Sequence, residues 1–237
     1  GEYLEKAVSQ NRIDRGRARG SEFKAPLERI DRKFGVDPYI VLGVWGMETN
    51  FGGFAGDHYV IRALATLAHA GYRGDFFKKE LLTALQILEQ GHVGREAFQG
   101  SWAGAMGQTQ FMPSSFKAYA VDFNGDGRRD IWSEDPGDAL ASTASYLARS
   151  GWQRGQPWGL EVRLPAGFDM GLAGRGKGRP AADWAAMGVT AAQGGGLPGG
   201  TGSVLAPAGA SGPGFLIFQN FNVILRYNNA ENYALGV

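Results

Sequence analysis

The sequence predicts a mainly α-helical protein with a small, loop-rich lobe that contains a little β-structure. Two observations lead to this fold class. From residue 1 to about 155, apolar residues recur at spacings of three and four and are separated by short polar or glycine breaks, as in amphipathic helices. From about 160 to 214, closely spaced glycine and proline disfavour long regular helices.

The helical part begins with an amphipathic segment at 22–35, which we expect to end at Gly35. Asp37 and Pro38 then form a cap and a first turn for a second helix at 38–50. By the same periodicity, further helices are expected at about 60–70, 74–90, 113–120 and 137–150.

The glycine-rich stretch is flanked by two apolar segments, EVRLP and GFLIFQ, that we expect to form short strands. The final residues, NFNVILRYNNAENYALGV, are again rich in aromatic and apolar side chains. We therefore divide the chain into a helical core at 1–160, a Gly/Pro-rich lobe at 161–214 and a C-terminal segment at 215–237.

The composition is that of an ordinary globular protein. With 237 residues, of which 43% are hydrophobic and 20% charged, the chain can bury one substantial core and a smaller lobe. The net charge of +1 comes from intermingled signs and does not suggest a nucleic-acid-binding face. There are no cysteines, which excludes disulfides and thiolate metal sites, and no apolar run is long enough to span a membrane.

Glu48 is the candidate catalytic residue, near the end of the helix expected at 38–50. Val41, Val44 and Trp45 share its helix face. A carboxyl group among apolar side chains loses solvation of its charged form, which raises its pKa toward that of a general acid near neutral pH. The alternative is a helix-end glutamate that simply reaches solvent. No pattern identifies a second acid, which paired-carboxylate glycosidases require.

A second candidate segment reads GSWAGAMGQTQFMPSSFKAYA. Its small residues let the backbone approach a ligand closely, and Gln108 and Gln110 form a polar pair. Ser101 and Gln110 are expected to hydrogen-bond to a sugar, while Trp102 and Phe111 stack on its apolar face. A tight turn with aromatic side chains in the core is the alternative for this segment.

Residues 122–132 read DFNGDGRRDIW, which matches the start of a calcium loop with glycine at its sixth position. Position twelve holds Ser133 instead of glutamate, so Glu134 or Asp138 must close the ring and the loop extends to 138. A surface turn without an ion is the alternative. A bound Ca²⁺ would be structural, because no coordination position is left open for chemistry. The expected ligands are Asp122, Asn124, Asp126, Asp138 and the backbone carbonyl of Arg128.

Several motifs in one order along the chain resemble the lytic murein transglycosylase B family. They are VWGMETNFG, ALATLA, GSWAGAMGQTQFMPSSFKAYAVDFNGDGRRDIW, DALASTASYLARSGW and NFNVILRYNNAENYALGV. Only the glycine-rich stretch from about 165 to 214 has no clear counterpart. The resemblance implies a lysozyme-like helical core to which the C-terminal segment returns at the cleft.

The resemblance also implies a reaction on peptidoglycan in which Glu48 performs both proton transfers. Glu48 first protonates the glycosidic oxygen between N-acetylmuramic acid and N-acetylglucosamine. As a base, it then takes the proton of the muramyl C6 hydroxyl, whose oxygen attacks C1 and forms a 1,6-anhydromuramyl end without water. No second carboxylate and no catalytic cofactor are then required.

Positions that match cleft residues of the family are expected to line the sugar subsites. For Tyr146 and Tyr227, packing in the core is the alternative, and for Arg73 an ordinary solvated arginine. The expected subsite residues are Ser101, Gln110, Phe111, Tyr146, Tyr227, Asn228, Tyr233 and Arg73.

Three other functions compete with this interpretation. A lysozyme-like muramidase would use the same acid but admit water at C1. A glycan-binding module would keep the cleft without using Glu48, and a calcium-dependent scaffolding protein would need only the metal loop. We expect a periplasmic monomer that acts on glycan strands and not on nucleic acid, with cell-wall synthesis or division proteins as further candidate partners. Family members carry an export signal and sometimes a lipid-bearing cysteine in preceding chain, so a membrane anchor would lie outside this sequence.

Overall fold

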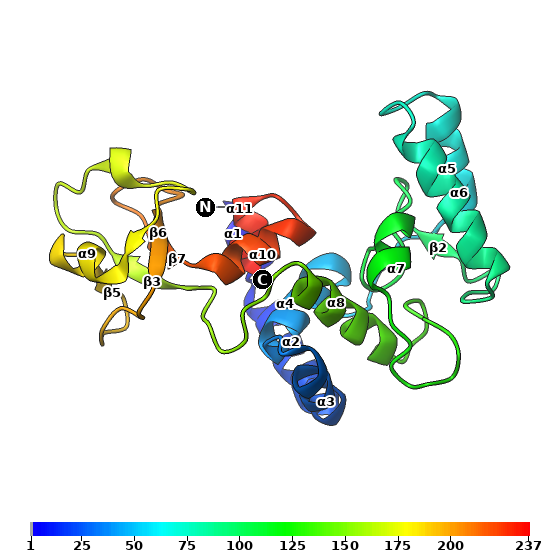
Figure 1. Ribbon diagram of the computed structural model, residues 1–237, viewed down its shortest axis with the longest axis horizontal. Coiled ribbons are helices and arrows are strands. Elements are labelled where there is room, and N and C mark those ends of the chain that lie inside the picture. Colours follow the sequence, from blue (N-terminus) through cyan, green and yellow to red (C-terminus); the bar gives the residue numbers. More distant parts are fainter. Residues whose placement is uncertain (1) are drawn as a thin grey trace. The chain divides into compact units, whose positions relative to one another are not determined.

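The structure, a computed structural model, describes residues 2–237 and divides into two compact units (Figure 1). The larger unit comprises residues 2–150 and 235–237, and the smaller unit residues 151–234. The boundary precedes the one expected at 160 because Gly159 already pairs with Ile217 in the sheet of the smaller unit. Residues 215–234 also belong to the smaller unit, because residues 214–217 pair with residues 159–162 in the same sheet. Among residues 2–237, no helix is both long and apolar enough to cross a membrane.

Helices dominate the larger unit, and those expected from apolar periodicity are present. In Figure 1, α5 and α6 lie side by side, and α6 packs on α7, α7 on α8, and α8 on α3 and α4. The elements are α1 (Glu2–Ala7), α2 (Gln10–Glu22), α3 (Lys24–Phe34), α4 (Pro38–Thr49), β1 (His58–Tyr59), α5 (Val60–His69), α6 (Phe76–Glu89), β2 (Gln99–Gly100), α7 (Pro113–Tyr119) and α8 (Gly137–Arg149).

Helix α2 was not expected, and its sequence explains why. It reads QNRIDRGRARGSE and contains no buried residue, so it lacks the apolar stripe that periodicity detects. Ser9 caps its start by accepting a hydrogen bond from the backbone N–H of Arg12 at 3.4 Å. Arg15 fixes it to the end of α4 by donating to the carbonyl oxygen of Asn50 at 3.1 Å.

The smaller unit is built on a five-stranded antiparallel sheet in the order β4-β6-β7-β3-β5. The two expected strands are present as β3 and β7, and they pair with each other. The elements of this unit are β3 (Gly159–Arg163), η1 (Met170–Leu172), β4 (Arg179–Pro180), α9 (Ala181–Ala186), β5 (Thr190–Ala191), β6 (Thr201–Leu205), β7 (Gly214–Ile217), α10 (Gln219–Tyr227) and α11 (Glu231–Gly236).

Strand β6 lies inside the stretch that the composition marked as irregular. A Cβ atom at Gly202 would lie 2.9 Å from the carbonyl oxygen of Ile217, so the close approach of β6 and β7 requires glycine there. Gly202 also accepts a hydrogen bond of 2.8 Å from the indole N–H of Trp184, which is fully buried in the core of this unit. Glycine is a poor strand former, so the sequence did not indicate β6, but Gly202 is the residue that allows β6 to pack against β7.

Asn220 fixes the start of α10 to the segment that leads into β3. Its side chain is fully buried. Its Oδ1 accepts from the backbone N–H of Gln153 at 2.7 Å, and its Nδ2 donates to the carbonyl oxygens of Gln153 at 2.9 Å and Gln156 at 2.7 Å. Asn220 therefore satisfies backbone groups that would otherwise lack partners.

We predict that Asn220→Ala lowers the free energy of unfolding by about 2 kcal/mol, because the substitution leaves these backbone groups without their partner. Urea unfolding followed by circular dichroism measures the change. Asn222→Ala, at an exposed position of the same helix, is the matched control and should be nearly neutral. Equal effects of the two substitutions would contradict the role assigned to Asn220.

Candidate active site

Helix α4 carries Glu48 on its last turn. Its start is fixed as expected, because the Asp37 carboxylate accepts a hydrogen bond of 2.8 Å from the backbone N–H of Tyr39 and Pro38 occupies the first turn. The helix is buried on most sides and not along one stripe only. Its buried residues are Ile40, Val41, Leu42, Val44, Trp45, Gly46 and Thr49, whereas Glu48 itself is half-buried.

The chain turns sharply directly after Glu48 and Thr49. Asn50, Phe51 and Gly52 have φ angles of 51°, 59° and 76°, so three consecutive residues, two of them not glycine, adopt the left-handed region. Such conformations are costly and persist only where surrounding contacts hold them. The Thr49 hydroxyl supplies one such contact by accepting a hydrogen bond of 3.1 Å from the backbone N–H of Gly52.

The glycine-rich segment after β2 lies against the end of α4. Met106 bridges to both Gly100 and Phe111, which folds the segment back on itself. Gly107 has a φ of 59°, and a Cβ atom there would lie 2.5 Å from the carbonyl oxygen of Ile131, so only glycine fits. The tight turn expected from the sequence is therefore present, and it contacts the end of the 122–138 loop.

Gln108 joins this turn to α4, a role that its membership of a polar pair in the sequence did not predict. Its Oε1 accepts a hydrogen bond of 2.8 Å from the indole N–H of Trp45, and its backbone carbonyl accepts one of 3.2 Å from the Thr49 hydroxyl. Its Nε2 donates to the carbonyl oxygen of Ser133, and its backbone N–H donates to the carbonyl oxygen of Ile131 at 2.8 Å. These partners are distant in sequence, so no local pattern indicated them.

The predicted subsite residues of this turn have different environments. Ser101 accepts a hydrogen bond of 3.1 Å from the backbone N–H of Ala105. Gln110 donates to the carbonyl oxygens of Ala55 and Gly107, both at 2.9 Å. Trp102 is 61% exposed and presents a stacking surface, whereas Phe111 is only 2% exposed. For Phe111, burial favours the core-packing alternative.

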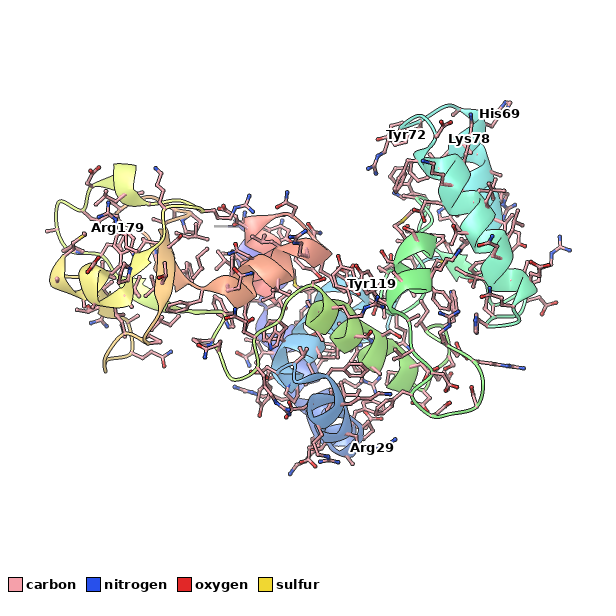
Figure 2. The ribbon with its side chains drawn as sticks, viewed as in Figure 1. Arg29, His69, Tyr72, Lys78, Tyr119 and Arg179 are labelled. Atoms are coloured by element: carbon pink, nitrogen blue, oxygen red, sulfur yellow. The ribbon has the colours of Figure 1, made fainter. Side chains whose placement is uncertain are left out.

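Tyr146 comes from α8 and extends the aromatic cluster around Phe111. Its ring lies 5.8 Å from that of Phe111 and 4.6 Å from that of Tyr119, measured between centroids. Tyr119 lies where α7 faces α8, as Figure 2 shows. The half-buried Tyr146 is thus positioned by the turn and by α7.

The remaining predicted subsite residues lie elsewhere in the chain. Arg73 is exposed in the connection between α5 and α6, beside the labelled Tyr72 in Figure 2, and its guanidinium lies 4.2 Å from the ring centroid of Phe76. Tyr227, Asn228 and Tyr233 belong to the smaller unit, in which Tyr233 is buried and Asn228 exposed. Their contribution to the sugar subsites stays a prediction.

Two cavities lie beside the end of α4 and the glycine-rich turn. One, of about 440 Å³, is lined by Trp45, Gly52, Gln108 and Glu134 among others. The second, of about 470 Å³, is lined by Gly56, His92, Asp130 and Trp132 among others. Burial lowers the pKa of His92, and the nearby Arg129 guanidinium lowers it further. A larger cavity of about 700 Å³ lies between α2, α4 and Val237, where the sequence indicated no chemistry.

The 122–138 loop is folded by hydrogen bonds from its backbone N–H groups to its own carboxylates. Asp122 accepts from the backbone N–H groups of Gly125 at 2.6 Å and Gly127 at 2.8 Å, and Asp126 accepts from Arg128 at 2.8 Å. These hydrogen bonds, led by that of Gly127, lower the pKa of the Asp122 carboxyl. The loop therefore keeps its first carboxylate ionised, as a cation ligand must be.

Of the two candidates for closing the ring, Asp138 faces the loop. Its carboxylate accepts hydrogen bonds from the backbone N–H groups of Phe123 and Asp130, both at 2.8 Å. Burial raises the pKa of Asp138, because it disfavours the charged form. Among residues 2–237, no three acidic or histidine side chains form a ready-made metal cluster. The oxygen ligands suit a hard cation, but Asn124 and Arg128 would have to contribute to its coordination.

Comparison with known proteins places this chain in a family. Residues 1–237 match the family model described as Transglycosylase SLT domain. Membrane-bound lytic murein transglycosylase B of Escherichia coli (strain K12) is 33% identical over 241 residues, an alignment that covers 99% of this chain. This chain spans 64% of the length of that relative.

Solved structures agree with this match. SltB3 from Pseudomonas aeruginosa, in complex with NAG-anhNAM-pentapeptide, has a TM-score of 0.95 and 51% identity over 99% of this chain and 64% of that chain. The Escherichia coli lytic transglycosylase Slt35, in complex with calcium, has a TM-score of 0.84 and 33% identity over 99% of this chain and 74% of that chain. These likenesses confirm the expected lysozyme-like, mainly helical fold. Because the family model matches residues 1–237, the chain belongs to the transglycosylase SLT domain family.

Proposed function

We propose that this chain is a peptidoglycan lytic transglycosylase that cleaves the β-1,4 bond between N-acetylmuramic acid and N-acetylglucosamine without adding water. The observation that carries the proposal is the likeness to SltB3, a structure that contains an anhydromuramyl ligand, at 51% identity and a TM-score of 0.95. Such an anhydro end is the product of intramolecular attack by the C6 hydroxyl. The same chemistry in this chain needs one group that gives and then takes a proton.

Glu48 is the residue proposed for both proton transfers. As an acid it protonates the glycosidic oxygen, the bond from this oxygen to C1 breaks, and N-acetylglucosamine leaves with a free 4-hydroxyl. As a base it takes the proton of the C6 hydroxyl while that oxygen bonds to C1, which restores the acid. Its half-buried position at the end of a buried helix, directly before a strained turn, supports this role.

The cleft residues would hold the sugars while these transfers occur. The exposed ring of Trp102 offers an apolar face for stacking, and the half-buried Ser101 and Gln110 lie on the same turn. Peptidoglycan as substrate places the protein in the periplasm. Cell-wall synthesis or division proteins are the further partners that this activity would suit.

We predict that Glu48→Gln lowers the rate at which 1,6-anhydromuropeptides are released from purified sacculi by roughly 100- to 10,000-fold, because an amide can neither donate nor accept the proton. Mass spectrometry of the soluble products measures the release. Glu89→Gln, the same change at the exposed end of α6, is the matched control and should retain full activity.

The released products distinguish the proposed transglycosylase from a hydrolase and from a glycan-binding module. Muramyl products with reducing ends would identify a hydrolase that admits water at C1. Activity that survives Glu48→Gln would reject Glu48 as the acid. A wild-type protein that binds sacculi but releases nothing would favour a glycan-binding module.

We further propose that the 122–138 loop binds Ca²⁺ in a structural role. Slt35, whose fold this chain shares, was solved with calcium, and the loop here offers only oxygen ligands around a preformed turn. The proposed ligands are those expected from the sequence, with Asp138 closing the ring. A bound ion would add positive charge between Asp122 and Asp138 and so reduce the repulsion of their carboxylates.

We predict that calcium at about 100 times its Kd raises the melting temperature by several degrees, since ligand binding to the folded state alone would add about 2.7 kcal/mol. Asp126→Asn should reduce the rise at the same calcium concentration, because it replaces a charged ligand with a neutral amide oxygen. It should leave the calcium-free melting temperature nearly unchanged, because the amide oxygen can still accept the hydrogen bond from Arg128. Differential scanning calorimetry with and without a chelator makes the measurement.

The control for this experiment is Asp183→Asn, which removes an exposed carboxylate from α9 in the smaller unit. This variant should keep the full calcium response. A wild-type melting temperature that is the same in calcium and in chelator would reject the calcium site.

A further inference from the structure

Gln108 is a buried polar residue that the proposed chemistry does not use. Its side chain is 6% exposed, in a part of the fold where its neighbours in sequence, Gly107 and Thr109, are also buried. A buried amide with unmet hydrogen bonds would be destabilising. In Gln108 the side-chain and backbone groups all have partners, and these partners belong to two separate segments.

The first segment is the end of α4, on both sides of Glu48 in the sequence. Trp45, three residues before Glu48, donates to the Gln108 side chain at 2.8 Å, and Thr49, the residue after it, donates to the Gln108 backbone at 3.2 Å. A Cβ atom at Gly52 would lie 2.5 Å from Gln108 Oε1, so the amide also lies against the left-handed turn. Gln108 thus contacts the helix end before and after Glu48.

The second segment is the end of the 122–138 loop. The Gln108 amide nitrogen donates to the carbonyl oxygen of Ser133, and the backbone N–H of Gln108 donates to that of Ile131 at 2.8 Å. Ile131 is fully buried, so this anchor is part of the core. Gln108 therefore links the last turn of α4 to a buried anchor in the loop.

We propose that Gln108 is a positioning residue, which holds the last turn of α4 so that the Glu48 carboxyl meets the glycosidic oxygen in a productive orientation. The inference rests on the proposed catalytic role of Glu48. A proton donor that is misplaced by about 1 Å can lose on the order of 100-fold in rate, even when the substrate still binds. The residue acts through Trp45 and Thr49 and needs no contact with the sugar.

The test compares Gln108→Met with the wild type on a soluble oligosaccharide of alternating N-acetylglucosamine and N-acetylmuramic acid. Methionine has a similar length, but it has no donor for Ser133 and its sulfur accepts only weakly from Trp45. We expect kcat to fall roughly 10- to 100-fold with KM within about 2-fold of the wild type. Gln86→Met, at an exposed site on α6, is the matched control and should leave both constants unchanged.

Trp45→Phe breaks the same hydrogen bond from the other side and keeps an aromatic ring between Phe23 and Phe51. It should lower kcat in the same way, and the double variant should lose no more than the stronger single variant, because both substitutions remove the hydrogen bond between Trp45 and Gln108. If Gln108→Met fails to fold, as judged by circular dichroism, Trp45→Phe alone decides the question.

Unchanged kcat in a folded variant would overturn the inference, and a rise in KM alone would then assign Gln108 to substrate binding. Losses that multiply in the double variant would also overturn it. Failure of the proposed function would give different results. The wild type would release no anhydromuramyl product, or the Glu48→Gln variant would be as active as the wild type.

Discussion

Helix α4 is buried on most sides, so the polar groups at its C-terminal end must find partners inside the protein. The indole N–H of Trp45 and the hydroxyl of Thr49 both meet Gln108. The orientation of the last turn, and with it the position of Glu48, therefore depends on a segment that lies about 60 residues away in the chain, a separation that local propensity does not determine.

This dependence explains which parts of the site could be predicted. The start of α4 follows from Asp37 and Pro38, whose capping chemistry is local, and its end lies where the expected helix stopped. Glu48 could be singled out because the apolar residues around it are neighbours in sequence. The role of Gln108 could not, because a polar residue in a glycine-rich turn has the same local pattern whether it faces solvent or joins two segments.

The two elements that the sequence did not single out have the same origin. Helix α2 is stabilised by its cap and by Arg15, which reaches Asn50 across the fold, and not by an apolar stripe. Strand β6 is stabilised by pairing with β7, at a place where glycine is required by the neighbouring backbone. In both cases tertiary contacts determine the local structure, and the local pattern did not single the element out.

The loop at 122–138 links α4 and α8, the two helices of the proposed site, because it reaches α4 through Gln108 and leads into α8. Asp138 opens α8, the helix that carries Tyr146, while Ile131 and Ser133 bond to Gln108 and so reach α4. Cationic side chains of α3 also lie beside the loop: Lys33 adds to the lowering of the Asp122 pKa, which the hydrogen bond from Gly127 leads, and the guanidinium of Arg29, labelled in Figure 2, lies 4.6 Å from the ring centroid of Phe123. The backbone hydrogen bonds of the turn and these cations together hold the acidic loop in shape. The protein's own contacts thus hold the loop in shape. A bound cation would add to contacts that already join the loop to α4 through Gln108 and to α8 through Asp138.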